Sequence, residues 1–177
     1  VALPTDRPAW GRLTRLLTLG KRRAEKGKCL LHEADVIAHA EGMILLWRAP
    51  LDPAGDLRPL RRWTRALPGR VHLLAAPGYD GKDARRFNCL AAEAETAGAP
   101  LVASAAPLYH RAFRRPLADV LTCIREGCTI DTLGRRAQPN AERRLRSEDE
   151  LRRLLGPHAE AVDRAAEIAA RCRFSLG

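Results

Sequence analysis

Three short apolar runs, separated by stretches with helical periodicity, constrain the fold of this chain more than any other feature of its sequence. The runs cover residues 43–47, 71–75 and 100–103. Each is a mainly apolar segment of strand length, and the first is continuous, which is typical of strands buried on both faces. Strands that alternate with helices pair in parallel through right-handed crossovers. The first two-thirds of the chain is therefore predicted to be an α/β unit with a parallel sheet.

The segments around these runs predict helices, some of them with recognisable end signals. Apolar residues at helical spacing predict a first helix over residues 8–26. Asp80 is a candidate N-cap for a later helix that ends at Gly98. Two more helices are expected over residues 33–40 and 57–67, and a turn over residues 51–55.

After Arg114 the pattern changes to helices without strands. Ser147 and Glu150 have the spacing of a capping box, in which each side chain accepts a hydrogen bond from the other residue's backbone amide. The expected helices cover residues 116–126, 147–155 and 157–172. We place a boundary near this change, which divides the chain into residues 1–113 and 114–177.

Clusters of basic residues are the chemical signal that points to a partner. The formal net charge is +10. This charge makes nucleic acid the leading partner class, although arginine-rich helix surfaces that face only water give the same composition. Contacts to phosphates would give affinity without sequence specificity and would weaken with salt. The candidate nucleic-acid-binding residues are Lys21, Arg22, Arg23, Lys26, Arg114, Arg115, Arg135 and Arg136, and Arg143, Arg144 and Arg146 extend the last cluster.

The cysteines and histidines do not form a metal-binding pattern. Five cysteines, with no C-x-x-C pair, argue against both a disulfide framework and a zinc cage and favour the reducing cytoplasm. Cys123 and Cys128 are expected to be buried thiols. The histidines include no His-x-His pair, and we interpret His72 and His110 as hydrogen-bonded structural residues rather than ligands.

Sequence motifs for catalysis are absent. The chain contains no G-x-S-x-G elbow, P-loop or G-x-G-x-x-G sequence. The carboxylates Asp80, Asp83, Glu93 and Glu95 have helical spacing on an expected solvated face, which argues against acid–base chemistry. We therefore predict no catalytic residue. No apolar run reaches the ~20 residues of a membrane-spanning helix, and the first residues lack the order of a signal peptide, so no membrane partner is expected.

Six segments, in order along essentially the whole chain, carry a stronger signal than the net charge. They are TLGKRRAEKG at residues 18–27, LYH at 108–110, RRPLADVLTCIREGCTID at 114–131, GRR at 134–136, NAER at 140–143 and EIAARCRFSL at 167–176. Together they resemble the error-prone branch of the bacterial DNA polymerase III alpha family. The stretch DVLTCIREG is highly specific to this family.

This resemblance implies a partial PHP-type β/α barrel, from the polymerase and histidinol phosphatase module, followed by an all-helical segment that leads toward the polymerase body. The family's aspartate and histidine metal ligands would fall at Ala106 and Leu108, whose side chains cannot bind a metal. The family's first His-x-His motif and the palm with its catalytic aspartates are not in this sequence. We therefore expect this chain alone to be inactive and without a cofactor, with magnesium serving the parent polymerase.

The same resemblance implies the partners and leaves three functions open. DNA, the rest of the polymerase, a sliding clamp and accessory mutagenesis proteins are the implied partners, in damage-induced translesion synthesis and DNA repair. The chain starts with Val1 rather than Met, so we expect either an excised fragment or a truncated gene product. The leading hypothesis is a noncatalytic scaffold near DNA. The alternatives are a metal-dependent PHP phosphoesterase and a stand-alone basic module that binds nucleic acid or protein.

Overall fold

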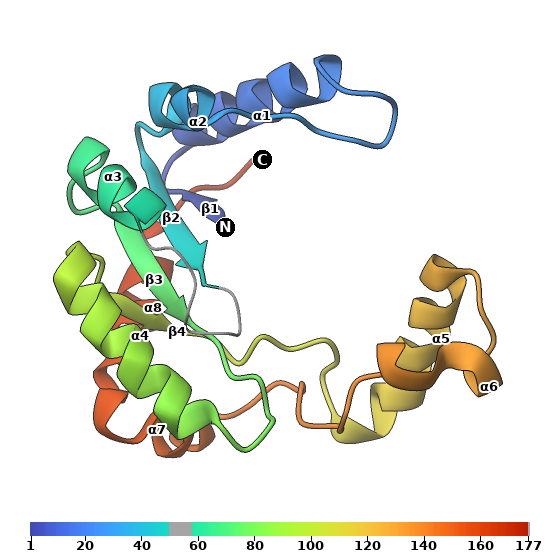
Figure 1. The fold of residues 1–177 in the computed structure, drawn as a ribbon. Coiled ribbons are helices and arrows are strands. Elements are labelled where there is room, and N and C mark those ends of the chain that lie inside the picture. Colours follow the sequence, from blue (N-terminus) through green and yellow to red (C-terminus); the bar gives the residue numbers. More distant parts are fainter. Residues whose placement is uncertain (50–57, 177) are drawn as a thin grey trace.

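A four-stranded open sheet forms the centre of the molecule in the computed structural model, which describes residues 1–49 and 58–176 (Figure 1). The strands are β1 (Ala2–Pro4), β2 (Met43–Arg48), β3 (Val71–Ala75) and β4 (Leu101–Ala103), and their order in the sheet follows the sequence. Strands β2, β3 and β4 pair in parallel. The prediction of an α/β fold with a parallel sheet is confirmed, and the PHP barrel stays a prediction.

Strand β1 was not expected, and it pairs antiparallel with β2. Its register places Ala2 opposite Leu45 and Pro4 opposite Met43. The N-terminal ammonium group of Val1 donates a hydrogen bond to the carbonyl oxygen of Leu46 at 2.8 Å. A three-residue edge strand is too short to show a recognisable sequence pattern. It also contains a proline, which cannot donate a hydrogen bond to the ladder and so argues against a strand.

Helix α1 (Arg7–Arg22) begins close to the predicted position and ends earlier. The side chain of Asp6 caps its first turn by accepting a hydrogen bond from the amide of Ala9 at 2.7 Å. Near the other end, a Cβ atom on Gly20 would lie 2.6 Å from Cys29 Sγ. The chain can therefore fold back along the helix, and the amide of Leu30 donates to the carbonyl oxygen of Gly20 at 2.9 Å.

The other helices of the first two-thirds are α2 (Glu33–His39), α3 (Arg58–Ala66) and α4 (Asp83–Ala97), as predicted within a few residues. The expected cap at Asp80 is wrong, since α4 has Lys82 at its N-cap position. Gly98 ends α4 in the left-handed conformation, with φ of 65°, which glycine adopts without steric cost. The predicted turn at residues 51–55 lies outside the described residues.

Beyond Arg114 the regular elements are helices, as expected: α5 (Arg115–Glu126), α6 (Ile130–Leu133), α7 (Glu148–Leu155) and α8 (Glu160–Arg171). The predicted capping box of α7 is present, with the amide of Glu150 donating to Ser147 Oγ at 3.3 Å. The short helix α6 was missed, because four residues carry no readable periodicity. An isolated parallel bridge also links Tyr109 to Arg144.

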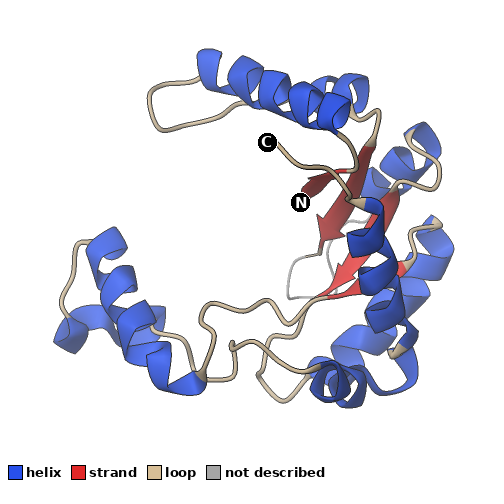
Figure 2. Ribbon diagram, turned by 180° about the vertical axis from the view of Figure 1, so that it is seen from behind, coloured by secondary structure: helices blue, strands red, loops and turns tan. Residues whose placement is uncertain are grey.

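The sheet is buried on both faces, as continuous apolar strands predict. One face carries Leu45 and Leu73, which pack in the main core with Phe87 of α4. The other face carries Ile44 and Val102, which pack with Ile168 of α8. Figure 2 shows α8 lying over this second face.

Helices α7 and α8 belong to the same core as the sheet. Leu155 of α7 and Val162 of α8 lie in the main hydrophobic cluster, and an Arg164 guanidinium nitrogen donates to the carbonyl oxygen of Leu101 at the start of β4. Helices α5 and α6 instead stand apart from the sheet in both views (Figures 1 and 2). The division of the chain near residue 113 stays a prediction.

Candidate functional site

The carboxyl ends of β3 and β4 lie side by side, and the loops that follow them form the candidate site. In open parallel sheets, ligands bind outside the carboxyl ends of the strands. The two loops are joined because Tyr79 Oη donates a hydrogen bond to the carbonyl oxygen of Ala105 at 2.9 Å. Tyr79 and Ala106 both have positive φ, 55° and 44°, which is uncommon for residues with a side chain. The surrounding contacts must therefore hold both loops in place.

The loop after β3 is held by a buried ion cluster at the start of α4. The carboxylate of Asp83 accepts hydrogen bonds from the amides of Gly78 at 2.7 Å and Tyr79 at 2.9 Å. The Arg86 guanidinium is only 7% exposed and pairs with both Asp83 and Asp80, the latter at 2.7 Å. The expectation that Asp83 lies on a solvated face is wrong, since this carboxylate is buried and organises the loop.

A side chain at position 78 would displace the Arg86 guanidinium from this cluster. A Cβ atom there would lie 2.8 Å from the nearest guanidinium nitrogen of Arg86. The Arg86 hydrogen bonds hold the pKa of Asp80 down, from 3.8 to about 2. The role of Arg86 was missed from sequence, although its spacing of three residues from Asp83 is that of a helical ion pair.

The loop after β4 contains the positions where the resemblance places metal ligands, and its contacts are made by Arg143, the Ser104 hydroxyl and the backbone. Ser104 Oγ accepts a hydrogen bond from the amide of Ala106 at 3.0 Å, and Arg143 Nε donates to the carbonyl oxygen of Ala106 at 3.1 Å. The amide of Leu108 donates to the carbonyl oxygen of Arg143 at 2.8 Å. The Leu108 side chain is 51% exposed. Neither Ala106 nor Leu108 supplies a donor atom suited to a metal.

A second arginine and an asparagine complete the contacts between the loops. The Arg146 guanidinium lies over the Tyr79 ring, 4.9 Å from its centroid, and Arg146 Nε donates to Tyr79 Oη at 3.2 Å. Asn140 Nδ2 donates to the carbonyl oxygen of Tyr79 at 2.7 Å. Segment 137–146, which contains the predicted basic residues Arg143, Arg144 and Arg146, thus connects the two loops.

Acidic partners neutralise much of this last cluster. Arg144 pairs with Glu150, and Arg146 pairs with Glu142. The Arg144 hydrogen bonds hold the pKa of Glu150 below its ordinary 4.5, at about 2. In residues 1–49 and 58–176, no three histidine, cysteine, aspartate or glutamate side chains gather as a metal site would require.

His72 and Cys123 are both buried, Cys123 as expected, whereas Cys128, also expected to be buried, is only partly buried. His72 lies in β3 as predicted, yet neither of its ring nitrogens makes a hydrogen bond in the described structure, which corrects the expectation of a hydrogen-bonded histidine. Burial, and then the nearby charges of Arg171 and Arg164, lower the pKa of His72. Burial raises the pKa of the Cys123 thiol, as does its hydrogen bond with Cys128. His110 is exposed and packs edge-on against Phe113.

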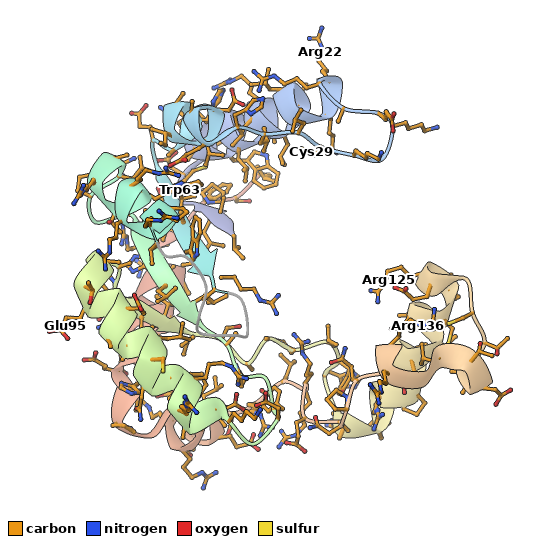
Figure 3. The ribbon with its side chains drawn as sticks, viewed as in Figure 1. Arg22, Cys29, Trp63, Glu95, Arg125 and Arg136 are labelled. Carbon is orange, nitrogen blue, oxygen red and sulfur yellow. The ribbon has the colours of Figure 1, made fainter. Side chains whose placement is uncertain are left out.

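The first group of predicted phosphate contacts lies at the end of α1 and in the loop beyond it. Arg23 is neutralised by Asp35 of α2. No ion pair with a described residue is seen for Lys21, Arg22 or Lys26, and all three are exposed. Arg22 points away from the molecule (Figure 3). These three cations are therefore the ones in this group best placed to meet phosphates.

The second group lies in the unit formed by α5, α6 and two 3-10 helices, Ala112–Arg114 and Gly134–Arg136. Figure 3 shows this unit and α1 on separate projections of the molecule. Arg115 donates to the carbonyl oxygen of Gln138 at 2.7 Å, and Arg136 donates to that of Thr132 at 2.9 Å. Arg114 stacks on Phe113. The structure does not bring the two groups together, and nucleic-acid binding by either group stays a prediction.

No family model matches this chain. The sequence is 52% identical over 176 residues to an error-prone DNA polymerase of Ruegeria pomeroyi, with 99% of this chain covered. It is 45% identical to an error-prone DNA polymerase of Caulobacter vibrioides and 42% identical to error-prone DNA polymerase 1 of Agrobacterium fabrum, each over 98% of this chain. The chain spans 16% of the length of each of these relatives.

These identities extend over the sheet, the strand-end loops and the helices beyond them, so the chain corresponds to a segment of bacterial DNA polymerases. In particular, it is homologous over nearly its whole length to a segment of the error-prone DNA polymerases. The predicted resemblance is confirmed. No helix in the described ranges is long and apolar enough to cross a membrane.

Proposed function

We propose that this chain is a noncatalytic, PHP-derived scaffold of an error-prone DNA polymerase and that it lies close to DNA. The observation that carries the proposal is the contact of Arg143 with Ala106 at the strand ends, in a chain homologous to such polymerases. A metal centre needs several ligand side chains aimed at one point. Here alanine and leucine occupy the two ligand positions that the resemblance assigns, and arginines hold the loops around them.

The DNA-proximal part of this proposal is supported by the exposed cations at the end of α1. Lys21, Arg22 and Lys26 are within six residues of one another and have no acidic partner among the described side chains. Unpaired lysine and arginine side chains release counterions from DNA when they bind its phosphates. Polymerisation itself is assigned to the parent polymerase, which would use magnesium, a sliding clamp and accessory mutagenesis proteins. This polymerase would work in the cytoplasm in damage-tolerant DNA synthesis.

The scaffold role is tested with hybrid polymerases. In one, this chain replaces the matching segment of the Ruegeria pomeroyi polymerase; in a second, that segment is deleted. Primer extension by the first and its loss in the second is the expected result. Equal primer extension by the hybrid and by the deletion variant would contradict a scaffold role. Release of phosphate by the isolated chain, dependent on added Mn²⁺ or Zn²⁺, would favour the phosphoesterase.

A further inference from the structure

An exposed apolar stripe runs along α5, and we call it the α5 stripe. It consists of Phe113, Leu117, Val120, Leu121 and Ile124, whose exposed fractions range from 44% for Val120 to 73% for Ile124. Four of these residues belong to α5, and Phe113 lies two residues before it. Their spacing confines the side chains to one arc of about 100° on a helix of 3.6 residues per turn. Such a stripe is the face by which a helix packs on another surface.

The packing of α5 within its own unit uses the opposite side. Cys123 of α5 and Leu133 of α6 are buried, at 6% and 4% exposure. Asp119, one turn before Cys123, pairs with Arg115 on the same side of the helix. Both ribbon views show this unit standing away from the sheet (Figures 1 and 2). The α5 stripe is therefore left uncovered by the part of the chain that the structure describes.

We propose that the α5 stripe docks against a region of the same polymerase that lies outside residues 1–177. This inference rests on the proposed function. The equivalent of this chain is 16% of the polymerase in each relative, so most of the polymerase is available to cover the stripe. Contiguous exposed apolar surface of this kind marks an interaction site. Tethering within one polypeptide raises the effective concentration of the two surfaces.

The charges beside the stripe indicate the chemistry of the surface that covers it. The Arg114 guanidinium lies over the Phe113 ring, 5.3 Å from its centroid, at one end of the stripe. Arg125, whose side chain is 72% exposed, follows Ile124 at the other end and shares its charge with Glu126, which its Nε contacts at 3.1 Å, so Arg114 is the cation beside the stripe without a described acidic partner. The occupant is therefore an apolar surface with acidic side chains at its rim. A second copy of this chain fits less well, because pairing two stripes would bring arginines together on chains that each carry a net charge of +10.

Hydroxyl-radical footprinting compares the isolated chain with the hybrid polymerase that contains it. Phe113, Leu117, Leu121 and Ile124 are expected to react in the isolated chain and to be several-fold protected in the hybrid. Leu30, which is 48% exposed in the loop after α1, is the internal control and should react in both. Equal reactivity of the stripe in the two proteins would overturn the proposal. Protection that appears in the isolated chain as its concentration rises would instead assign the stripe to a second copy.

A substitution supplies an independent readout. Ile124→Glu should leave the melting temperature of the isolated chain unchanged, because this side chain is already 73% exposed, and should lower that of the hybrid by several degrees. Leu30→Glu is the matched control and should change neither. An unchanged hybrid with Ile124→Glu would overturn the proposal. DNA binding by Lys21, Arg22 and Lys26 is measured on the isolated chain, so its failure would count against the proposed function and not against this docking surface.

Discussion

Arg143 Nε donates a hydrogen bond to the carbonyl oxygen of Ala106 at 3.1 Å, and this contact joins segment 137–146 to the loop after β4. Ala106 has a positive φ of 44°, so its backbone conformation must be held by its surroundings. At the position where the resemblance places an acidic metal ligand, a cation thus holds the backbone.

Removal of the Arg143 side chain should loosen this loop. The amide of Leu108 donates to the carbonyl oxygen of Arg143, so its hydrogen exchange reports on the contact. Hydrogen bonds to charged groups contribute about 1.5–3 kcal/mol, and Arg143→Ala should therefore speed exchange at Leu108 by about tenfold or more. Arg153→Ala, at an exposed position of α7, is the control. Unchanged exchange at Leu108 would show that the contact does not hold the loop.

Loss of the buried cation at the start of α4 should destabilise the whole protein. Arg86→Ala leaves the carboxylate of Asp83 buried without its ion-pair partner, and breaking a buried pair in this way costs about 3–5 kcal/mol. Urea unfolding measures the change. The neighbouring residue provides a control, because Arg85 is exposed and Arg85→Ala should change the free energy of unfolding by less than about 0.5 kcal/mol. Similar effects of the two substitutions would contradict the structural role of Arg86.

Two glycines of the same helix, α1, should respond in opposite directions to alanine. In Gly20→Ala the new Cβ atom would lie 2.6 Å from Cys29 Sγ and 2.7 Å from a methyl carbon of Leu31, and this overpacking should cost about 1–3 kcal/mol. In Gly11→Ala the nearest atom is 3.8 Å away, so the better helix propensity of alanine should stabilise the protein by up to about 1 kcal/mol. Thermal unfolding of the two variants tests both signs.

Acid should destabilise the protein through two carboxylates whose pKa values are lowered by arginine. The folded-state pKa of Asp80 is about 2 instead of 3.8, and that of Glu150 is about 2 instead of 4.5. A lowered pKa contributes stability above the unfolded-state value, and this contribution is lost as the pH falls toward the folded-state value. The free energy of unfolding should therefore fall between about pH 4.5 and pH 2. The variant with both Asp80→Asn and Glu150→Gln should show a smaller fall, and an identical fall would contradict these pairings.

The elements with strong local signals were predictable from the sequence, and those that depend on distant partners were not. Strand β3 coincides with its predicted run, and the α7 capping box is in place, because buried strands and helix caps are encoded by adjacent residues. Strand β1 needs β2 as its partner and has only three residues. It is therefore invisible without the tertiary structure.

The candidate site shows the same limit. The resemblance assigned Ala106 and Leu108 to a strand end near residue 108, whereas β4 ends at Ala103 and both residues lie in the loop after it. The burial of Asp83 did not follow from the sequence, because helical spacing alone does not say which face of α4 turns toward the loops. Whether a basic residue is free or paired also depends on distant acids, such as the Asp35 that neutralises Arg23.

The proposed DNA-proximal, noncatalytic role is tested most directly by titrating fluorescent primer–template DNA with the purified chain at two salt concentrations, with metal content read on the same sample. Substitution of Lys21, Arg22 and Lys26 by alanine should weaken binding and reduce the steepness of its salt dependence by roughly two to three units, about 0.9 for each phosphate that is no longer neutralised. A variant with Arg12, Arg62 and Arg152 changed to alanine loses the same charge from cations that are paired with acids. It should keep most of the salt dependence. The account predicts salt-sensitive binding without stoichiometric metal, whereas absent binding, or stoichiometric Mn²⁺ or Zn²⁺ with phosphate release, would contradict it.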